Sequence, residues 1–400
     1  MYTFSSSQWI WRLLTLQIVL EQYVVKSGWI VEAREDREKT SLLMFAGELQ
    51  RDVPERNREP VPYCDIWEGD NYKKYLPTLV ASARLSREPA QLSLDAIAEA
   101  NRFEKERNHR LSQQQEDAKT LWEEETHQRF AKPMRLDPLR RISVHAKNYQ
   151  QTDARHWEVI VTRGFAAPFS PKGATWREKT RYMVRQMSQL VVLCEFLYGH
   201  GVLHRDISDS NVMQMDNNVF LIDFDCSAIC AHGPSGSKFE LTGQLDCMAI
   251  DLLRVLREKT ASARHLARHE LESILYLFFL RFIAIIRKHD RELANVLGGE
   301  DASSINQNVR SNNAGGMQNL KAKLSFTALA ENISEKEHPG LKALYRELGE
   351  LQRRGLCGRK EFLAAGRAQE QQDSDATFWS LALDLRTAFY AYVKCPDEAM

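Results

Sequence analysis

Two short apolar segments of the chain carry carboxylate side chains at their ends, and only a few residues separate them. Residues 201–213 read GVLHRDISDSNVM, and residues 219–226 read VFLIDFDC. Their β-branched and aromatic residues favour short buried strands. If two such strands lie side by side, Asp206, Asn211 and Asp223 converge on one small volume.

These three side chains suit magnesium chemistry. Asn211 and Asp223 offer an amide carbonyl and a carboxylate, which are the hard oxygen ligands that Mg²⁺ prefers. Asp206 then remains as a metal-free carboxylate that can accept the proton of an attacking hydroxyl group. Such general-base assistance is worth about 10²- to 10⁴-fold. Positioning and charge neutralisation have to supply the rest of the rate enhancement.

The pattern HRDxxxxN followed by DF resembles the catalytic loop and the metal-binding loop of protein kinases. The sequences HRDISDSN, LIDFD, LTGQLDCMAID and HELES are similar to those of the fungal-type protein kinases in particular. YVVKSGW resembles the strand that carries the kinase lysine, here with a turn predicted at SGW. The resemblance covers about residues 20–290. It implies an α+β, two-lobed protein kinase-like fold, with a small β-rich N-terminal lobe, either complete or shortened, and a mainly helical C-terminal lobe.

The resemblance also implies the reaction and the roles of three residues. ATP and magnesium would be the cofactors, and a protein Ser or Thr hydroxyl would accept the phosphoryl group. Asp206 would be the catalytic base, and Asn211 and Asp223 would be the magnesium ligands. No substrate-loop signature separates Ser/Thr from Tyr specificity.

The same resemblance gives Lys26 the role of holding the α- and β-phosphates. Its acidic partner is expected on the helix predicted at 33–50, which carries Glu35 and Glu38 on its apolar stripe. Of the two, Glu38 is favoured because it lies closer to the apolar body of that helix.

Arg205 would pair with a phosphorylated activation segment. Segment 157–165 would be the last strand and hinge of the N-terminal lobe, offering backbone groups to adenine. Four hydroxyl residues are candidate phosphorylation sites: Ser227, Ser235, Ser237 and Thr242.

Several positions depart from the usual kinase pattern. No GxGxxG sequence lies upstream of Lys26, so the phosphate-covering strand pair is shortened, replaced by a stretch such as SSSQW, or lost. Asp225 stands where most kinases have the glycine of DFG, and glycine would permit freer backbone rotation. Asp251 replaces the usual glutamate of the APE position, and Glu270 replaces an aspartate at the start of the next helix.

Hydrophobic periodicity and loop residues divide the chain into three parts. Long helices are predicted at about 175–200 and 269–288, and a mobile loop at 299–318. The predicted division is an N-terminal lobe at 1–164 with a charged helical insertion at about 92–140, a C-terminal lobe at 165–300, and a helical extension at 301–400.

Composition limits the partners. The chain has 54 basic and 54 acidic residues, so its overall field does not favour nucleic acid or an anionic membrane, and neither partner is expected. Seven cysteines without CxxC spacing favour reduced thiols inside the cell, in the cytoplasm or the nucleus. The first residues lack a basic start and a cleavage site, so no signal peptide or membrane anchor is expected. The oligomeric state stays open.

Two alternatives to a protein kinase remain. One is a non-catalytic pseudokinase scaffold, which the missing glycine-rich loop would favour. The other is a small-molecule phosphotransferase of the aminoglycoside or choline kinase type, which also carries a catalytic Asp, an Asn five residues later and an IDFD-like strand. The Arg of HRD and the TGxxxxMA segment argue against this second alternative.

Overall fold

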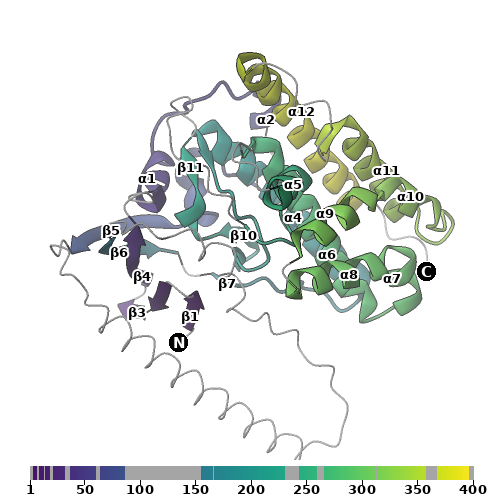
Figure 1. The fold of residues 1–400 in the computed structure, drawn as a ribbon, viewed down its shortest axis with the longest axis horizontal. Helices are drawn as coiled ribbons and strands as arrows, with labels where there is room; N and C mark the ends of the chain where they lie inside the picture. The colour runs from purple at the N-terminus through teal and green to yellow at the C-terminus, as the bar shows by residue number, and fades with distance from the viewer. Residues whose placement is uncertain are drawn as a thin grey trace, which may run out of the picture.

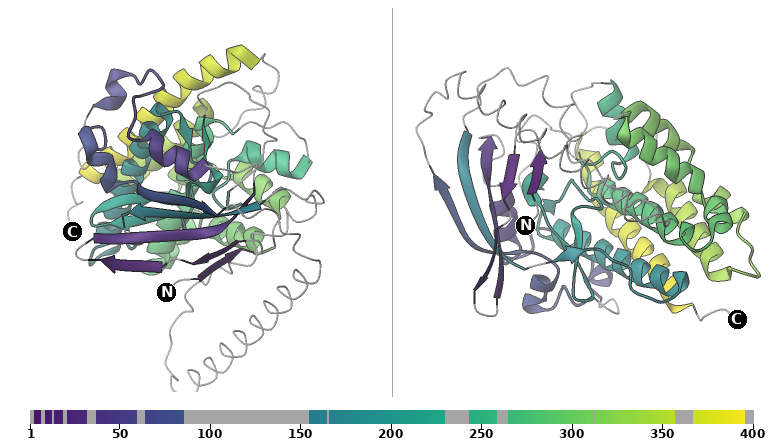
Figure 2. Two further views of the ribbon diagram at one scale, coloured as in Figure 1. Left: turned by 90° about the vertical axis from the view of Figure 1, so that its left-hand side faces the viewer. Right: turned by 90° about the horizontal axis from the view of Figure 1, so that it is seen from below.

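A β-rich part and a larger helical part of the chain lie side by side (Figures 1 and 2). The predicted charged insertion at about 92–140 lies outside the described residues. The computed structural model describes residues 3–6, 9–12, 14–18, 21–31, 37–59, 64–85, 155–164, 166–229, 243–258, 265–311, 313–356 and 367–395.

A four-stranded antiparallel sheet forms most of the β-rich part, in the order β3-β4-β6-β5. The prediction of a turn at SGW was wrong. Ser27 pairs with Val159 and Trp29 pairs with Trp157, because β6 is long enough to extend the ladder past Lys26. The strands are β3 (Leu14–Ile18), β4 (Glu21–Val31), β5 (Thr78–Leu85) and β6 (Arg155–Arg163).

A short hairpin precedes this sheet. Strand β1 (Thr3–Ser6) pairs with β2 (Trp9–Arg12), and β2 contacts β4. The stretch SSSQW therefore includes residues from both strands of this hairpin. A strand pair upstream of Lys26 is therefore present and not lost, and both a shortened pair and a replacement by SSSQW stay predictions.

Helix α1 (Arg37–Met44) is shorter than the predicted helix at 33–50. Its end is closed by a tight turn, in which the Gly47 amide donates to the Met44 carbonyl at 3.1 Å. Glycine is among the poorest helix formers, so the helix ends before it. Leu42 and Phe45 are buried and attach α1 to the core.

Two long helices form the centre of the helical part, as predicted. Helix α4 (Trp176–Gly199) begins with a capping box between Thr175 and Glu178. Helix α6 (Ala267–Arg287) is buried around most of its circumference and packs against α4. Together they supply the apolar core on which the catalytic segments rest.

Short strand pairs hold the two carboxylate-bearing segments next to each other. Strand β9 (Val212–Met215) pairs with β10 (Asn218–Leu221), and β7 (Ala167–Pro168) pairs with β9. Strand β8 (Val202–Leu203) pairs with β11 (Ala228–Ile229). The prediction that the two segments lie side by side is confirmed.

The predicted mobile loop at 299–318 was wrong, because α8 and α9 cover most of it. Ala302, Ile305 and Met317 are buried, and Asn313 caps α9 by accepting a bond from the Gly316 amide. Burial of these apolar side chains stabilises α8 and α9. The polar composition of this segment did not indicate helices. The C-terminal helices are α7 (Arg291–Val296), α8 (Gly299–Arg310), α9 (Ala314–Lys323), α10 (Phe326–Glu331), α11 (Pro339–Leu351) and α12 (Arg367–Lys394).

Helix α12 packs along α4 and also contacts α2 (Glu55–Arg58). Its Arg386 forms a buried ion pair with Glu195 of α4 at 3.4 Å and donates to the Arg56 carbonyl at 2.7 Å. Helix α12 therefore packs into the same hydrophobic core as α4 and α6. The division at residue 300 stays a prediction.

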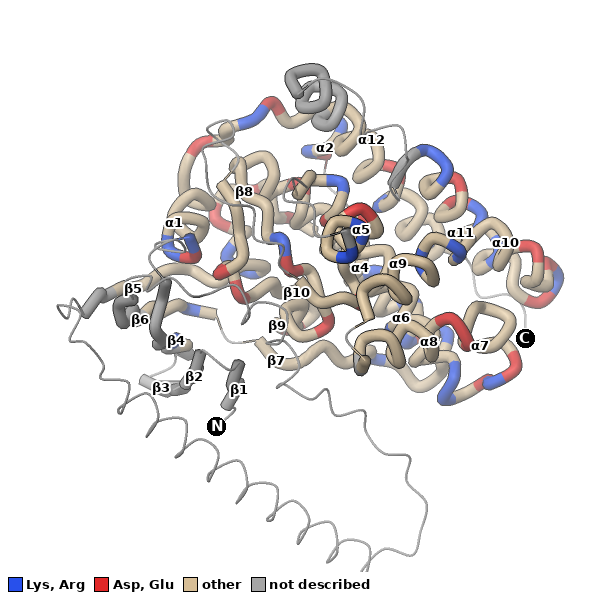
Figure 3. The backbone as a smooth tube through the Cα atoms, in the orientation of Figure 1, with Lys and Arg blue, Asp and Glu red and all other residues tan. Residues whose placement is uncertain are grey.

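Charged residues of both signs are interspersed along the described helices (Figure 3). Among the described residues, no helix is both long enough and apolar enough to cross a membrane.

Candidate active site

Asp206 and Asn211 face each other across the loop that follows β8. The Asn211 side-chain amide donates to the Asp206 backbone carbonyl and to its carboxylate Oδ2, each at 2.9 Å. Both residues are buried, with side chains at most 8% exposed. His204 anchors the loop by a 2.9 Å bond between its Nε2 and the Ile222 carbonyl oxygen. The carboxylate of Asp206 is thus oriented by the residue five positions later.

Asp223 is brought beside this loop by the backbone of its neighbour. The Ile222 amide donates to the Asn211 carbonyl at 3.0 Å. Asp223 itself has a φ of +69°, which turns the chain sharply into the 3₁₀ helix Phe224–Cys226. A non-glycine residue with this backbone conformation is uncommon and typical of functional sites.

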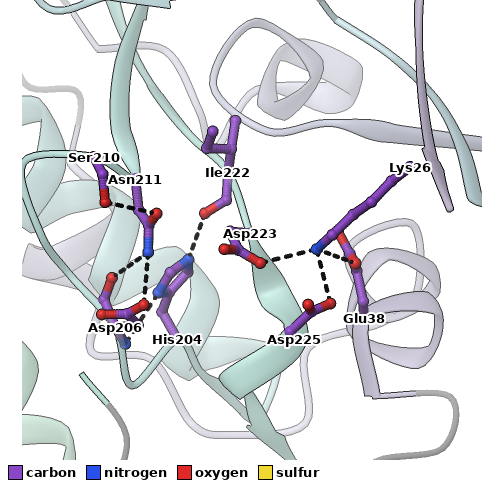
Figure 4. Close-up of polar contacts among 9 residues, drawn as sticks. All are labelled: Lys26, Glu38, His204, Asp206, Ser210, Asn211, Ile222, Asp223 and Asp225. Carbon is purple, nitrogen blue, oxygen red and sulfur yellow. Dashed lines mark hydrogen bonds and ion pairs between the residues drawn. The ribbon is translucent and has the colours of Figure 1, made fainter. Parts of the chain in front are cut away.

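Lys26 contacts three carboxylates at once (Figure 4). Its Nζ lies 2.7 Å from Glu38 Oε2, 2.8 Å from Asp223 Oδ1 and 2.8 Å from Asp225 Oδ1. Lys26 comes from β4 and Glu38 from α1, whereas the two aspartates follow β10. Glu38 is thus the partner of Lys26, and Glu35 lies outside the described residues.

This cluster holds more negative than positive charge. Burial lowers the pKa of Lys26, but Asp223, Asp225 and Glu38 outweigh it and hold that pKa well above its usual value. Burial raises the pKa of Glu38, and the repulsion of Asp225 and Asp223 raises it further. An excess of carboxylate over ammonium attracts a metal cation to this position.

The side chains present suit magnesium. The Asn211 amide nitrogen is engaged with Asp206, so its carbonyl oxygen faces away from that residue, where it accepts a bond from the Ser210 hydroxyl at 3.2 Å. Asp223 is one third exposed and offers a carboxylate on the adjacent segment. Magnesium commonly takes one or two protein oxygens and completes its shell with water and phosphate. In the part of the chain that the structure describes, no group of three or more His, Cys, Asp or Glu side chains could hold a metal ion.

Arg205 has a φ of +68°, and its backbone amide donates to Glu270 Oε1 at 2.9 Å. Burial alone would raise the pKa of Glu270, but bonds from His265 and Arg205 bring it below its usual value. Glu270 thus remains a charged anchor for the catalytic loop, although an aspartate was the expected residue.

One predicted phosphorylation site is not accessible. Ser227 is fully buried, and its Oγ lies 2.7 Å from that of Ser41 on α1. This hydroxyl joins α1 to the segment after Asp225. The candidates Ser235, Ser237 and Thr242 lie outside the described residues.

The anchor at Asp251 is formed despite the shorter side chain. Asp251, in α5 (Ile250–Glu258), pairs with Arg268 on α6. Burial would raise the pKa of Asp251, but His269 and Arg268 hold it well below its usual value. The adjacent Ile250 amide donates to Glu272 at 2.9 Å.

The end of β6 requires glycine. Gly164 has a φ of +115°, and a Cβ atom there would lie 2.6 Å from the Phe220 ring. Phe165 lies outside the described residues, so the predicted hinge role of 157–165 stays a prediction.

Sequence reasoning missed two sets of contacts. Asp225 was predicted only as a departure from the DFG glycine and not as a contact of Lys26, although the second acid of LIDFD was a visible signal. Arg281 of α6 binds Asp209 at 2.6 Å and the Val212 carbonyl at 3.2 Å, which ties the catalytic loop to the core. No motif pointed to Arg281, because it lies inside an apolar helix.

A β-rich lobe that supplies a lysine–glutamate pair, and a helical lobe that supplies Asp206, Asn211 and Asp223, define the class of the protein kinases. The family model described as fungal protein kinase matches residues 8–282, and the chain belongs to that family.

Two similar proteins extend the comparison. A probable casein kinase I homologue of Encephalitozoon cuniculi (strain GB-M1) is 26% identical over 204 residues, which cover 46% of this chain and 58% of that protein. The match thus spans less than two thirds of that relative. The structure of vaccinia related kinase 3 aligns with a TM-score of 0.36 and 12% identity, covering 81% of this chain and 75% of that one.

Proposed function

We propose that this protein transfers the γ-phosphoryl group of ATP to a Ser or Thr hydroxyl of a protein substrate, with magnesium. One observation carries the proposal. The fold brings together groups from segments up to 197 residues apart: the Lys26 ammonium, the Asp223 carboxylate and the Asp206–Asn211 pair. These are the groups that phosphoryl transfer needs for positioning and charge neutralisation.

In this proposal Asp206 accepts the proton of the substrate hydroxyl as its oxygen attacks the γ-phosphorus. The new oxygen–phosphorus bond forms while the bond to the β-phosphate oxygen breaks, and ADP leaves. Asn211 keeps the Asp206 carboxylate turned toward the hydroxyl through its 2.9 Å bond. Lys26 exchanges part of its carboxylate contacts for the α- and β-phosphates.

Asn211 and Asp223 would hold magnesium, which when bound neutralises charge on the phosphates. The net negative charge of the Lys26 cluster supports this assignment, because without a cation it would repel a nucleotide. Asp225 adds to that charge from 2.8 Å away from Lys26.

The kind of acceptor and the location are also part of the proposal. Membership of a protein kinase family and similarity to a probable casein kinase I homologue support a protein hydroxyl, here Ser or Thr. The scattered cysteines support a place inside the cell.

The test is a phosphoryl-transfer assay with γ-labelled ATP and magnesium, using a mixture of dephosphorylated proteins as acceptors. Asp206→Asn keeps the size of the side chain but cannot accept the proton. We expect label on Ser or Thr with the wild type, and a loss of about 10²-fold or more with this variant.

Three results would contradict parts of the proposal. Label on tyrosine alone would overturn the Ser/Thr assignment. Label on choline or an aminoglycoside, and not on protein, would favour a small-molecule phosphotransferase. ATP binding without transfer to any acceptor would favour a scaffold.

A further inference from the structure

Gln244 connects the segment before α5 to the catalytic loop. Its side-chain Nε2 donates to Ser208 Oγ at 3.0 Å and to Ser210 Oγ at 2.6 Å. Ser208 is fully buried, and both serines lie between Asp206 and Asn211. One amide group therefore contacts both hydroxyls of the loop that separates the proposed base from the proposed metal ligand.

The hydrogen bonds continue from Ser210 to Asn211. Ser210 Oγ donates to Asn211 Oδ1 at 3.2 Å, and the two serine hydroxyls lie 3.2 Å apart. A hydroxyl has one donor hydrogen and two acceptor positions. Ser210 accepts from Gln244 and donates its own hydrogen to Asn211. The bonds thus run in one direction, from Gln244 through Ser210 to the Asn211 carbonyl oxygen.

That oxygen is the part of Asn211 that suits a cation. The amide nitrogen is held by two 2.9 Å bonds to Asp206, which fixes the orientation of the side chain. A carbonyl oxygen has two lone pairs. One accepts the Ser210 hydrogen, and the other can coordinate a cation.

Gln244 is itself held on both sides. Gly243 has a φ of +119°, and a Cβ there would lie 3.3 Å from the Arg205 carbonyl oxygen, so the backbone packs closely on the catalytic loop. On the other side, the buried Lys321 of α9 donates to the Leu245 carbonyl at 3.1 Å and the Met248 carbonyl at 2.6 Å. These contacts keep the Gln244 side chain within reach of the serines.

We propose that Gln244 is a positioning residue of the metal site, which acts through Ser210 to fix the Asn211 oxygen that holds magnesium. The inference rests on the proposed function. Partners that orient a metal ligand typically change metal affinity 10- to 100-fold when they are removed.

The test measures the magnesium concentration needed for half-maximal thermal stabilisation at a fixed ATP concentration. We compare Gln244→Ala, Ser210→Ala, the double variant and a matched control, Gln307→Ala, on the surface of α8. Each single change should raise the midpoint about tenfold or more. The double variant should not exceed the larger single effect, because both changes break one chain of bonds. Stabilisation by ATP without metal should match the wild type, as should every response of the control.

The outcomes separate this inference from the proposed function. A normal magnesium response in the wild type with an unchanged midpoint in Gln244→Ala, or fully additive effects in the double variant, overturns the positioning role and leaves the proposed function intact. A wild type with no magnesium-dependent response overturns both. If Gln244→Ala does not fold, Ser210→Ala decides, because it removes a single hydroxyl.

Discussion

The Lys26 ammonium lies 2.8 Å from Asp225, a residue 199 positions later that stands where most kinases have glycine. Glu38, Asp223 and Asp225 therefore all contact the Lys26 ammonium. In the proposed function, this ammonium binds the phosphates of ATP. Its charge has two opposite effects, because it attracts a metal ion and repels the nucleotide. In the absence of metal we expect only the repulsion of the nucleotide.

We predict that Asp225→Asn lowers the Kd for ATP in the absence of divalent metal, by up to about tenfold. The change removes one negative charge from a partly exposed position, where solvent screens its interactions. Isothermal titration with a chelator present measures the affinity. Weaker metal-free binding in this variant would show that Asp225 supports Lys26 rather than competing for it.

Loss of the buried ion pair between Glu195 and Arg386 should strongly lower the free energy of unfolding. Above pH 7, where Glu195 is charged, Arg386→Met leaves it buried without its charged partner, and this should lower the free energy of unfolding by about 3–5 kcal/mol. The double variant Glu195→Met/Arg386→Met should be less damaged than the single variant. Chemical denaturation measures both. A loss below about 1 kcal/mol in the single variant would show that α12 does not depend on this contact.

The convergence of Asp206, Asn211 and Asp223 could be predicted because their spacing and the flanking apolar strands are local features. The choice of Glu38 also agreed with the contact that Lys26 forms. The continuation of β4 past SGW could not be predicted, because it depends on the distant partner β6. The same holds for α8 and α9, whose polar surface conceals the few residues that bury them. The chemical roles of the site residues remain proposals.

Glu195 should also make stability depend on pH. Burial raises its pKa from 4.5 to about 7, against the opposing effects of Arg386 and Asn57. Because the folded state then binds more protons than the unfolded state, stability should fall as the pH rises from about 4.5 to about 7. The full effect is on the order of 3 kcal/mol.

Glu195→Gln should remove this part of the slope, as measured by denaturation at a series of pH values. Glu272, whose pKa burial also raises to about 7, should keep a similar contribution in the variant. An unchanged slope between pH 4.5 and 7 in Glu195→Gln would contradict the assignment.

Gly164→Ala should destabilise the protein by more than about 1 kcal/mol, because it combines an unfavourable backbone conformation with overpacking. Its added Cβ would meet the Phe220 ring at 2.6 Å. Phe220→Leu in the same chain should relieve the steric contact but not the backbone strain, so thermal unfolding should show partial recovery. Full tolerance of alanine would mean that the end of β6 can shift.

The most direct test of a nucleotide site is thermal unfolding with and without ATP and magnesium. ATP at 100 times its Kd should stabilise the wild type by about 2.7 kcal/mol, in a magnesium-dependent way. Asp223→Asn should lose most of this gain. The matched control is Asp216→Asn, which changes an exposed aspartate with a similar positive φ of +55°. Magnesium-dependent stabilisation in the wild type and the control, but not in Asp223→Asn, is the predicted result. No stabilisation of any of the three proteins at millimolar ATP would contradict it.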